Sequence, residues 1–413
     1  MPVIARYATV TLIPFVLIVI GATLWGGAAA LALLWLTLIA AGMDTLLDPP
    51  KPSENPSDPW ADRLSVVLGI AHLTLLPVVL VALAGGGLSL GAWLALFLAT
   101  ASFFGQVSHP NAHELIHRQN RGLRALGATV YTSVGFGHHV SAHRLVHHRF
   151  VGTEDDPNTP LPGESFWAYL PRAWVGSFQS GLAREEERLD RKDLPAHSVQ
   201  NPYLLWVGGA ALSLGLAMWA AGFVGGVLLI LLALLTGAQI LMSDYIQHYG
   251  LQRLELDNGR MEPVGAHHSW NAPKGFSSYL MLNAPAHSEH HMHPDRPYDR
   301  LDPGADVPTL PYSMPVMAML ATIPAAWQRV MDRRALRVME AAQHRLKHAP
   351  PIRPRRPVRA EPAAETPPEP VQEVVQDDTD SKVVKGPFKG APPPAPTPDD
   401  VDALLARVAR ASD

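Results

Sequence analysis

Nine histidines stand in four short groups along this chain, and they are the residues best suited to chemistry. A neutral imidazole is a good ligand for iron, copper, nickel and zinc. Nine imidazoles exceed the roughly four to six ligands that one such ion accepts, so their number predicts two metal ions. The four groups are His113 and His117; His143, His147 and His148; His248; and His287, His290 and His291.

The spacing inside the groups predicts which imidazoles share an ion. Residues three or four apart lie on the same face of an α-helix, close enough for a common ligand. His148 follows His147 directly and is rotated from it by about 100° around a helix, so these two are expected to reach different ions. Pairs four apart are His113 with His117, His143 with His147 and His287 with His291.

Residues 113–117 also satisfy the H-E-x-x-H pattern of zinc proteases, in which Glu114 would be the general base. A protease needs only one or two further ligands, and the other grouped histidines exceed that need. A metal carrier or sensor is a further alternative. The chain contains no Cys, which excludes thiolate chemistry, disulfides, zinc fingers and iron–sulfur clusters.

The elements that position these histidines are predicted to cross a membrane. Only 17% of the 413 residues are charged, against about 25% in a typical soluble domain. Three long stretches lack Asp, Glu, Lys and Arg, and each can hold two spanning helices of about 20 residues joined at a central glycine turn. We therefore expect an all-α polytopic membrane bundle of about six transmembrane helices. The uncharged stretches are residues 7–43, 64–108 and 201–243, with turns near Gly26, Gly85 and Gly222.

The charges also predict an orientation. The three turns carry no Lys or Arg, whereas the opposite ends of the helices and all of the longer connections do. By the positive-inside rule that face is cytoplasmic, which places the histidine-rich site on the cytoplasmic side of the inner membrane. No basic patch interleaved with aromatic residues occurs, so no nucleic-acid role is assigned.

The remaining segments are expected to flank this bundle. Residues 154–171 are rich in turn formers and predict a loop, and residues 174–191 have the pattern of an amphipathic helix. Residues 310–331 are apolar but interrupted by prolines, which favours a surface-lying segment. We predict one membrane domain, residues 1–348, followed by a Pro-rich disordered tail, residues 349–413, with a possible short terminal helix.

Several elements resemble the membrane-bound alkane monooxygenases, part of a wider set of histidine-rich integral-membrane di-iron enzymes that includes fatty acid desaturases. The segment Asp244–Leu251 is similar to the N-Y-x-E-H-Y-G-L element of that family, and His268–Asn271 reads H-S-W-N before the last histidine group. Residues 155–157 and 291–294 fit as well. The sequence departs from the family pattern at Gln247, Ala142 and residues 284–286.

The resemblance implies a site of two non-haem iron ions held by all nine histidines, with no catalytic residue beyond the metal ligands. Glu114, Asp244 and Glu289 are candidates for the outer hydrogen-bond partners that metal-bound imidazoles need. A substrate channel would reach the metals from the bilayer lipid.

The implied reaction is O₂-dependent hydroxylation of an alkane to a 1-alcohol. A chain without Cys cannot carry its own rubredoxin, so an external rubredoxin with its reductase is expected to supply the electrons. A xylene-type methyl hydroxylase and a fatty acid desaturase would share the ligands and the topology, and both remain alternatives.

Overall fold

The computed structural model describes residues 3–53, 59–272 and 275–348, and the regular structure within these ranges is helical. The described residues form no strand, and pair only in two isolated β-bridges, Glu255 with Met261 and Asn271 with Thr309. The all-α prediction is confirmed. The predicted tail, residues 349–413, lies outside the described residues and stays a prediction.

Four of the described helices are long and apolar enough to cross a membrane. A fifth, shorter apolar helix consists of α2 (Gly27–Leu34), η1 (Trp35–Ile39) and α3 (Ala40–Met43). The helix Leu90–Ile116 comprises α5 (Leu90–Phe103), the π-turn η2 (Phe104–Ser108) and α6 (His109–Ile116). The four long helices are α1 (Val3–Thr23), α4 (Trp60–Ala84), Leu90–Ile116 and α11 (Tyr203–His248).

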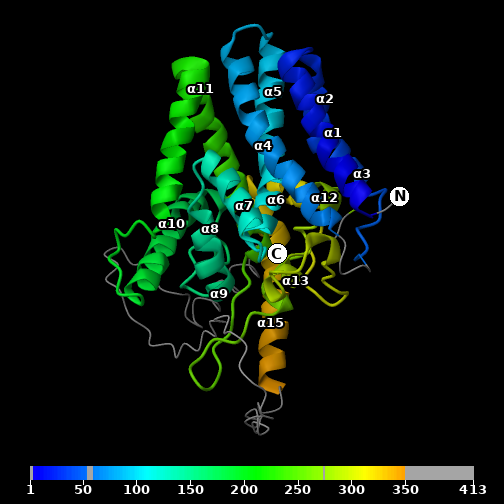
Figure 1. The fold of residues 1–413 in the computed structure, drawn as a ribbon. Coiled ribbons are helices and arrows are strands. Elements are labelled where there is room, and N and C mark those ends of the chain that lie inside the picture. Colours follow the sequence, from blue (N-terminus) through cyan, green and yellow to red (C-terminus); the bar gives the residue numbers. More distant parts are fainter. Residues whose placement is uncertain (1–2, 54–58, 273–274, 349–413) are drawn as a thin grey trace, which may run out of the picture. The chain divides into compact units, whose positions relative to one another are not determined.

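The predicted glycine turns are present. α1 ends at Thr23 and α2 begins at Gly27, and α4 ends at Ala84 before the Gly85–Gly87 turn. α11 is two helices joined at Gly222, whose φ of +65° is favourable only for glycine. Figure 1 shows the two halves of α11 meeting near the same end of the bundle as the other two turns.

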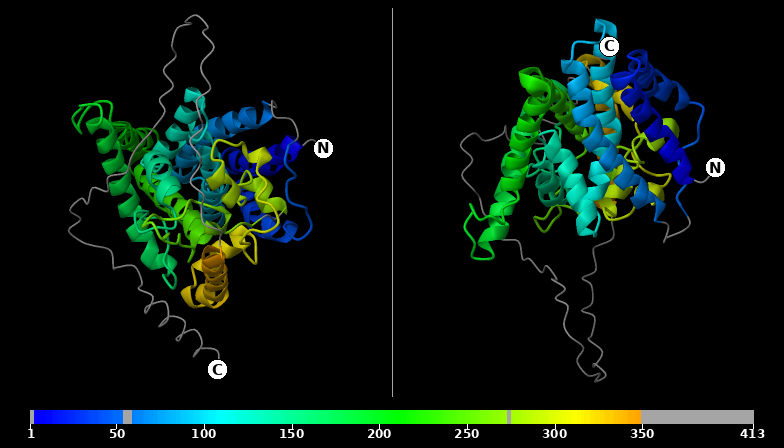
Figure 2. Two further views of the ribbon diagram at one scale, coloured as in Figure 1. Left: turned by 90° about the horizontal axis from the view of Figure 1, so that it is seen from below. Right: turned by 45° about the horizontal axis from the view of Figure 1, so that its top comes forward.

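The apolar helices pack side by side in three hairpins. α4 and α5 lie between α11 on one side and α1 with α2 on the other, as the views in Figure 1 and Figure 2 agree. Their outer surface is strongly apolar, with Leu24, Trp219 and Phe223 exposed by 84%, 85% and 76%. Water would solvate such a surface poorly, whereas lipid suits it.

The histidine-bearing ends of these helices are covered by the remaining elements. Two segments differ from the prediction. The predicted loop is wrong for residues 166–171, because Ser165 caps α10 and the helix begins at Phe166. The segment 310–331 is divided between α14 and the start of α15. The remaining elements are α7 (Arg121–Ser133), α8 (His139–Ala142), η3 (His143–His147), α9 (His148–Phe150), α10 (Phe166–Asp190), η4 (Ala266–His268), α12 (Gly275–Leu280), α13 (His287–Met292), η5 (Tyr298–Arg300), α14 (Met314–Ala321) and α15 (Pro324–His348).

Candidate metal centre

All nine predicted histidines converge on one region of the structure, although they span residues 113–291. They divide into two sets, and within each set the candidate ligand nitrogens all lie within 4.8 Å of one another. We call these sets the five-histidine group and the four-histidine group. The five-histidine group is His113, His117, His143, His148 and His290; the four-histidine group is His147, His248, His287 and His291.

The Nε2 atoms of the five-histidine group face each other at close range. His143 Nε2 lies 2.8 Å from His113 Nε2 and 2.9 Å from His148 Nε2. His148 Nε2 is also 3.1 Å from His290 Nε2. His117 contributes a ring 4.6 Å from that of His148, centroid to centroid, and its buried Nε2 has no hydrogen-bond partner.

The four-histidine group has the same character. His287 Nε2 lies 2.9 Å from His248 Nε2 and 3.1 Å from His291 Nε2. His147 completes the group, with its ring centroid 4.8 Å from that of His248, and its Nε2 is buried without a partner. The two groups adjoin, since the rings of His148 and His291 stack with centroids 4.5 Å apart.

This arrangement fits metal ions better than hydrogen bonds. A ring nitrogen has either one hydrogen or one lone pair, so Nε2 of His143 cannot pair fully with two neighbouring Nε2 atoms. The same applies to His148 and to His287. Two imidazoles bound at right angles to one ion, each at about 2.1 Å, would place their nitrogens about 3 Å apart. The observed separations and the two orphaned nitrogens of His117 and His147 therefore suit two bound cations.

The pairing within the second histidine segment differs from the prediction. His143 lies in the five-histidine group with His148, five residues away, whereas His147 lies in the four-histidine group. The reason is the π-turn η3, in which the backbone N–H of His148 donates to the carbonyl of His143. Such an i to i+5 bond brings residues five apart onto one face. The expectation that His147 and His148 point to different ions agrees with this geometry.

Burial keeps six of these imidazoles in the form that binds metals. Removal from water lowers the pKa of His117, His143 and His148 well below the ordinary value, and neighbouring histidines lower it further. The pKa values of His287, His290 and His291 are lowered by the same two causes. A neutral imidazole presents a free lone pair, so these side chains can ligate a cation at neutral pH.

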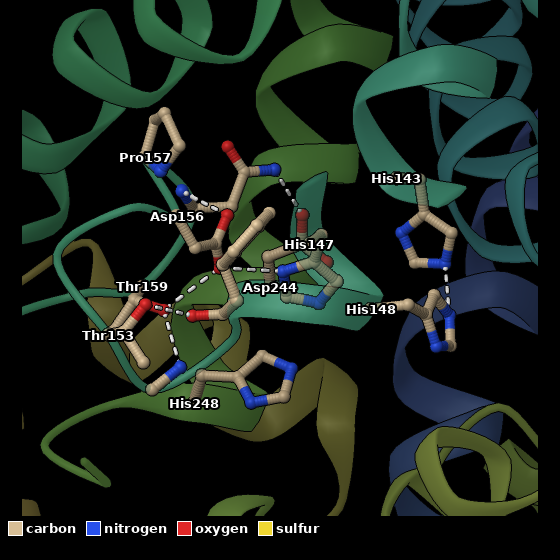
Figure 3. A network of polar contacts seen from close by, with 12 residues as sticks. His143, His147, His148, Thr153, Asp156, Pro157, Thr159, Asp244 and His248 are labelled. Atoms are coloured by element: carbon tan, nitrogen blue, oxygen red, sulfur yellow. Dashed lines mark hydrogen bonds and ion pairs between the residues drawn. The ribbon is translucent and has the colours of Figure 1, made fainter. Parts of the chain in front are cut away.

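Two of the nine imidazoles have clear outer partners. His147 Nδ1 donates to Asp156 Oδ2 at 2.8 Å, as Figure 3 shows, and His248 Nδ1 donates to the backbone carbonyl of His268 at 3.0 Å. Each bond fixes the hydrogen on Nδ1 and leaves Nε2 free to face its group. Burial raises the pKa of Asp156, but its interaction with His147 and the hydrogen bonds from His147, Asn158 and Thr159 outweigh burial, so the pKa is lowered and Asp156 is ionised.

The loop that follows α9 holds Asp156 in place. Its carboxylate accepts from the hydroxyl of Thr159 at 2.9 Å and from the backbone N–H of Asn158 at 3.0 Å. The Thr159 hydroxyl in turn accepts from the backbone N–H of Gly152 at 2.8 Å. These contacts, visible around Asp156 in Figure 3, orient the carboxylate toward His147.

The three carboxylates predicted as outer partners lie in different surroundings. Asp244 lies within 4.8 Å of ligand atoms of His143 and His147 and accepts from Asn158 Nδ2 at 2.8 Å. Glu114 pairs with Arg118 at 2.7 Å and accepts from the backbone N–H of Tyr298. Glu289 pairs with Arg296 and His293. Among the described contacts, neither glutamate bonds to one of the nine histidines.

Sequence reasoning did not select Asp156, although the Asp155–Pro157 element was noted as part of the resemblance. It also did not select Glu262, whose carboxylate accepts from His268 Nε2 at 3.0 Å. His268 Nδ1 accepts from the backbone N–H of Gly265, so the imidazole is neutral with its hydrogen on Nε2. This pair supports the backbone carbonyl that orients His248.

Comparison with known proteins agrees with this geometry. A family model described as fatty acid desaturase matches residues 58–319, a range that holds all nine histidines. Alkane 1-monooxygenase 1 of Pseudomonas aeruginosa is 31% identical over 69% of this chain and 76% of its own length. The chain belongs to the alkane hydroxylase family. That family lies within the larger desaturase and hydroxylase superfamily.

Other members of the superfamily are also similar. Alkane 1-monooxygenase 1 of Alcanivorax borkumensis is 35% identical to this chain. The match covers 58% of this chain and 60% of the relative's length. The xylene/toluene monooxygenase hydroxylase component of Pseudomonas putida is 28% identical over 58% of the chain. Together with the apolar helices, these relatives indicate a metal-binding membrane oxidoreductase.

Proposed function

We propose that this protein is a membrane-bound di-iron monooxygenase that hydroxylates the terminal methyl group of an alkane to a 1-alcohol. The observation that carries the proposal is the division of nine histidines into two adjoining groups. Within each group, neighbouring Nε2 atoms lie about 3 Å apart. The relatives named as alkane 1-monooxygenases support the choice of reaction.

The residues of the two groups would hold one iron each, and bound iron would activate O₂ for attack on an unactivated C–H bond. The balanced reaction consumes an alkane, O₂, two electrons and two protons, and yields the 1-alcohol and water. The electrons would come from outside the chain, from a rubredoxin-type donor with its reductase.

The protein's own residues would position the ligands. Asp156 would hold the hydrogen of His147 on Nδ1, and the carbonyl of His268 would do the same for His248. With Nε2 thus free of hydrogen, both imidazoles present their lone pairs to the four-histidine group. Asp244, close to His143 and His147, would add negative charge beside the two cations.

We further propose six membrane crossings: α1, the helix Gly27–Met43, α4, the helix Leu90–Ile116, and the two halves of α11. Each adjacent pair forms a hairpin with an uncharged turn, and the histidine-bearing ends carry the Lys and Arg residues. The metal centre would then lie on the cytoplasmic side of the inner membrane.

An apolar pocket of about 240 Å³ offers a route for substrate from the bilayer. It lies between η1, η2, the second half of α11 and α14, and its wall includes Ile246, two residues before His248. Gly105 and Gln106 of η2 line it near the start of α6, the helix that carries His113. An alkane dissolved in lipid could enter here without passing through water.

The zinc protease alternative finds less support. A general base must face the metal and the attacking water, whereas the Glu114 carboxylate is engaged by Arg118 and by the backbone of Tyr298. Aromatic methyl hydroxylation is the stronger second candidate, because the xylene/toluene relative shows detectable similarity.

Metal and product analysis tests the proposal. The purified protein, supplied with iron, rubredoxin, its reductase and NADH, is given n-alkanes from octane to hexadecane, p-xylene and an acyl lipid. Two irons per chain and a 1-alcohol as main product would support it. A main product with a new double bond, preference for p-xylene, or about one zinc per chain would each contradict it.

A further inference from the structure

A long apolar groove, lined by none of the nine histidines, lies between α4, α7 and the first half of α11. Its volume is about 730 Å³, and along α11 its lining runs from Leu205 to Ala220. Fifteen helical steps correspond to roughly 22 Å, more than half the thickness of a bilayer's hydrocarbon core. The groove therefore has the length and character of a site for an extended hydrocarbon chain. Its walls include Leu76, Leu80, Leu212, Leu216 and Trp219.

One end of this groove continues into a second, polar hollow of about 420 Å³. Ala125, Ala128 and Trp206 line both spaces, so the two are contiguous. Trp206 lies in the first turn of α11, at the end of the helix that adjoins the α10 surface. Indole rings favour the boundary between lipid and water.

The polar hollow is cationic. Three arginines, Arg124, Arg144 and Arg188, line it together with one carboxylate, that of Glu185. Glu185 is already engaged, because it pairs with Arg188 at 2.7 Å and accepts from the Ser141 hydroxyl at 2.7 Å. Two positive charges therefore remain without a matching negative charge in this hollow.

Arg144 is the most available of the three. Its side chain is exposed, and within the part of the chain that the structure describes it forms no hydrogen bond or ion pair. Arg124 donates from one guanidinium nitrogen to the backbone carbonyls of Arg118 and Gln119, which fixes the head group at the rim. An anion placed between Arg124 and Arg144 would supply the missing charge.

We propose that the groove and the cationic hollow together bind an anionic phospholipid, with an acyl chain along α11 and the phosphate between Arg124 and Arg144. An alkane has no charge for the arginines to recognise, and a free phosphate gains nothing from the groove. Basic pockets beside membrane helices are suited to anionic lipid head groups. The hollow also offers more volume than a single fatty acid carboxylate occupies.

Lipid retention by the full-length protein tests this site. Wild-type protein, delipidated in neutral detergent, is titrated with phosphatidylglycerol or phosphatidylcholine and bound lipid is counted by native mass spectrometry. We expect one phosphatidylglycerol to bind in preference to phosphatidylcholine. Arg144→Gln should weaken phosphatidylglycerol binding about fivefold, and Arg124→Gln with Arg144→Gln by more than tenfold. Ala125→Phe, which would obstruct the junction without changing charge, should weaken it as well.

Arg184→Gln is the matched control, because Arg184 lies one turn from Arg188 on α10 but outside the hollow. It should bind phosphatidylglycerol like the wild type. Equal binding by the arginine variants, or equal binding of phosphatidylcholine, would overturn the proposal. Displacement of the lipid by inorganic phosphate alone, by palmitate or by hexadecane at comparable concentration would also overturn it in favour of that ligand. Iron content, measured in parallel, reports whether each variant has folded.

Discussion

His147 and Asp156 form a buried pair, with Nδ1 and Oδ2 2.8 Å apart and both side chains about 1% exposed. The pair joins the four-histidine group to the loop between α9 and α10. A carboxylate in this place raises the electron density of the imidazole and holds its hydrogen on Nδ1. The position of Asp156 is itself fixed by Thr159 and Asn158.

Asp156→Asn should therefore lower iron affinity about 10- to 100-fold, the usual effect of losing such an outer partner. Asparagine keeps the shape but loses the charge, and its amide can present a donor to Nδ1. Iron retained in competition with a chelator measures the effect. Asp155→Asn, at the exposed neighbouring position, is the control and should bind iron like the wild type. Unchanged iron retention in Asp156→Asn would show that Asp156 has no part in the metal centre.

Adjacent histidines of α13 belong to different groups, which permits a matched pair of variants. His290→Ala removes a side chain from the five-histidine group and His291→Ala removes one from the four-histidine group. We expect the larger loss from His291→Ala, with about one iron remaining per chain, because its group has fewer ligands to spare. Elemental analysis and Mössbauer spectroscopy measure the number and environments of the irons.

The neighbouring His293→Ala serves as control, since the side chain of His293 is 48% exposed and lies outside both groups. The assignment of two separate irons would be wrong if His290→Ala and His291→Ala gave identical spectra with the same iron content as the wild type.

Much of this architecture follows from local sequence. A glycine near the centre of each uncharged stretch was sufficient to predict the turns, and in two of them Gly86 and Gly222 adopt a positive φ that other residues disfavour. The convergence of the histidines was also expected, since the charge pattern placed all four groups on the same side of the predicted membrane helices. Hydrophobic length and residue type carry this information directly.

The pairing of ligands was not predictable in the same way. The partnership of His143 with His148 depends on the π-turn η3, which helical periodicity does not reveal. Asp156 reaches His147 through a loop, and loop conformation depends on tertiary contacts such as that of Arg172 with the carbonyl of Pro157. The Glu114 carboxylate accepts a hydrogen bond from the backbone N–H of Tyr298, 184 residues away, a contact that the local sequence does not reveal.

Glu262 supplies a prediction about pH. Burial raises the pKa of this carboxyl, but hydrogen bonds from His267 and His268 lower it more, so its pKa lies well below the ordinary value of 4.5. A lowered native pKa means that the carboxylate stabilises the fold above pH 4.5 and that this contribution is lost as the pH falls further. Glu262→Gln should lower stability by about 1 kcal/mol at neutral pH and by less in acid.

Thermal unfolding of the metal-free protein between pH 7 and pH 3 (about the span in which a glutamate titrates) checks this. The metal is removed beforehand so that its release in acid does not contribute to the pH dependence of unfolding in any variant. Glu255→Gln, at an exposed position on the same segment, should follow the wild type throughout. A difference between Glu262→Gln and wild type that stays constant down to the lowest pH would contradict the assignment of charge to Glu262.

Substrate length gives the last prediction. Ala318 on α14 lines the 240 Å³ pocket that we propose as the alkane route. Ala318→Phe would fill part of this pocket, so the longest accepted alkanes should lose about 1–3 kcal/mol of transition-state binding, or roughly tenfold or more in kcat/KM. Shorter alkanes should be affected much less. Gas chromatography of the alcohols formed from an equimolar alkane mixture measures the change in preference.

Two variants separate this route from other effects of added volume. Leu320 lies on the same helix but does not line the pocket. Leu320→Phe should therefore leave the preference among alkane lengths unchanged. Leu212→Trp narrows the groove beside α7 instead, which we assign to a phospholipid. If Leu212→Trp shortened the accepted alkanes while Ala318→Phe did not, the alkane would reach the metals through the groove, and neither the route nor the lipid assignment would stand.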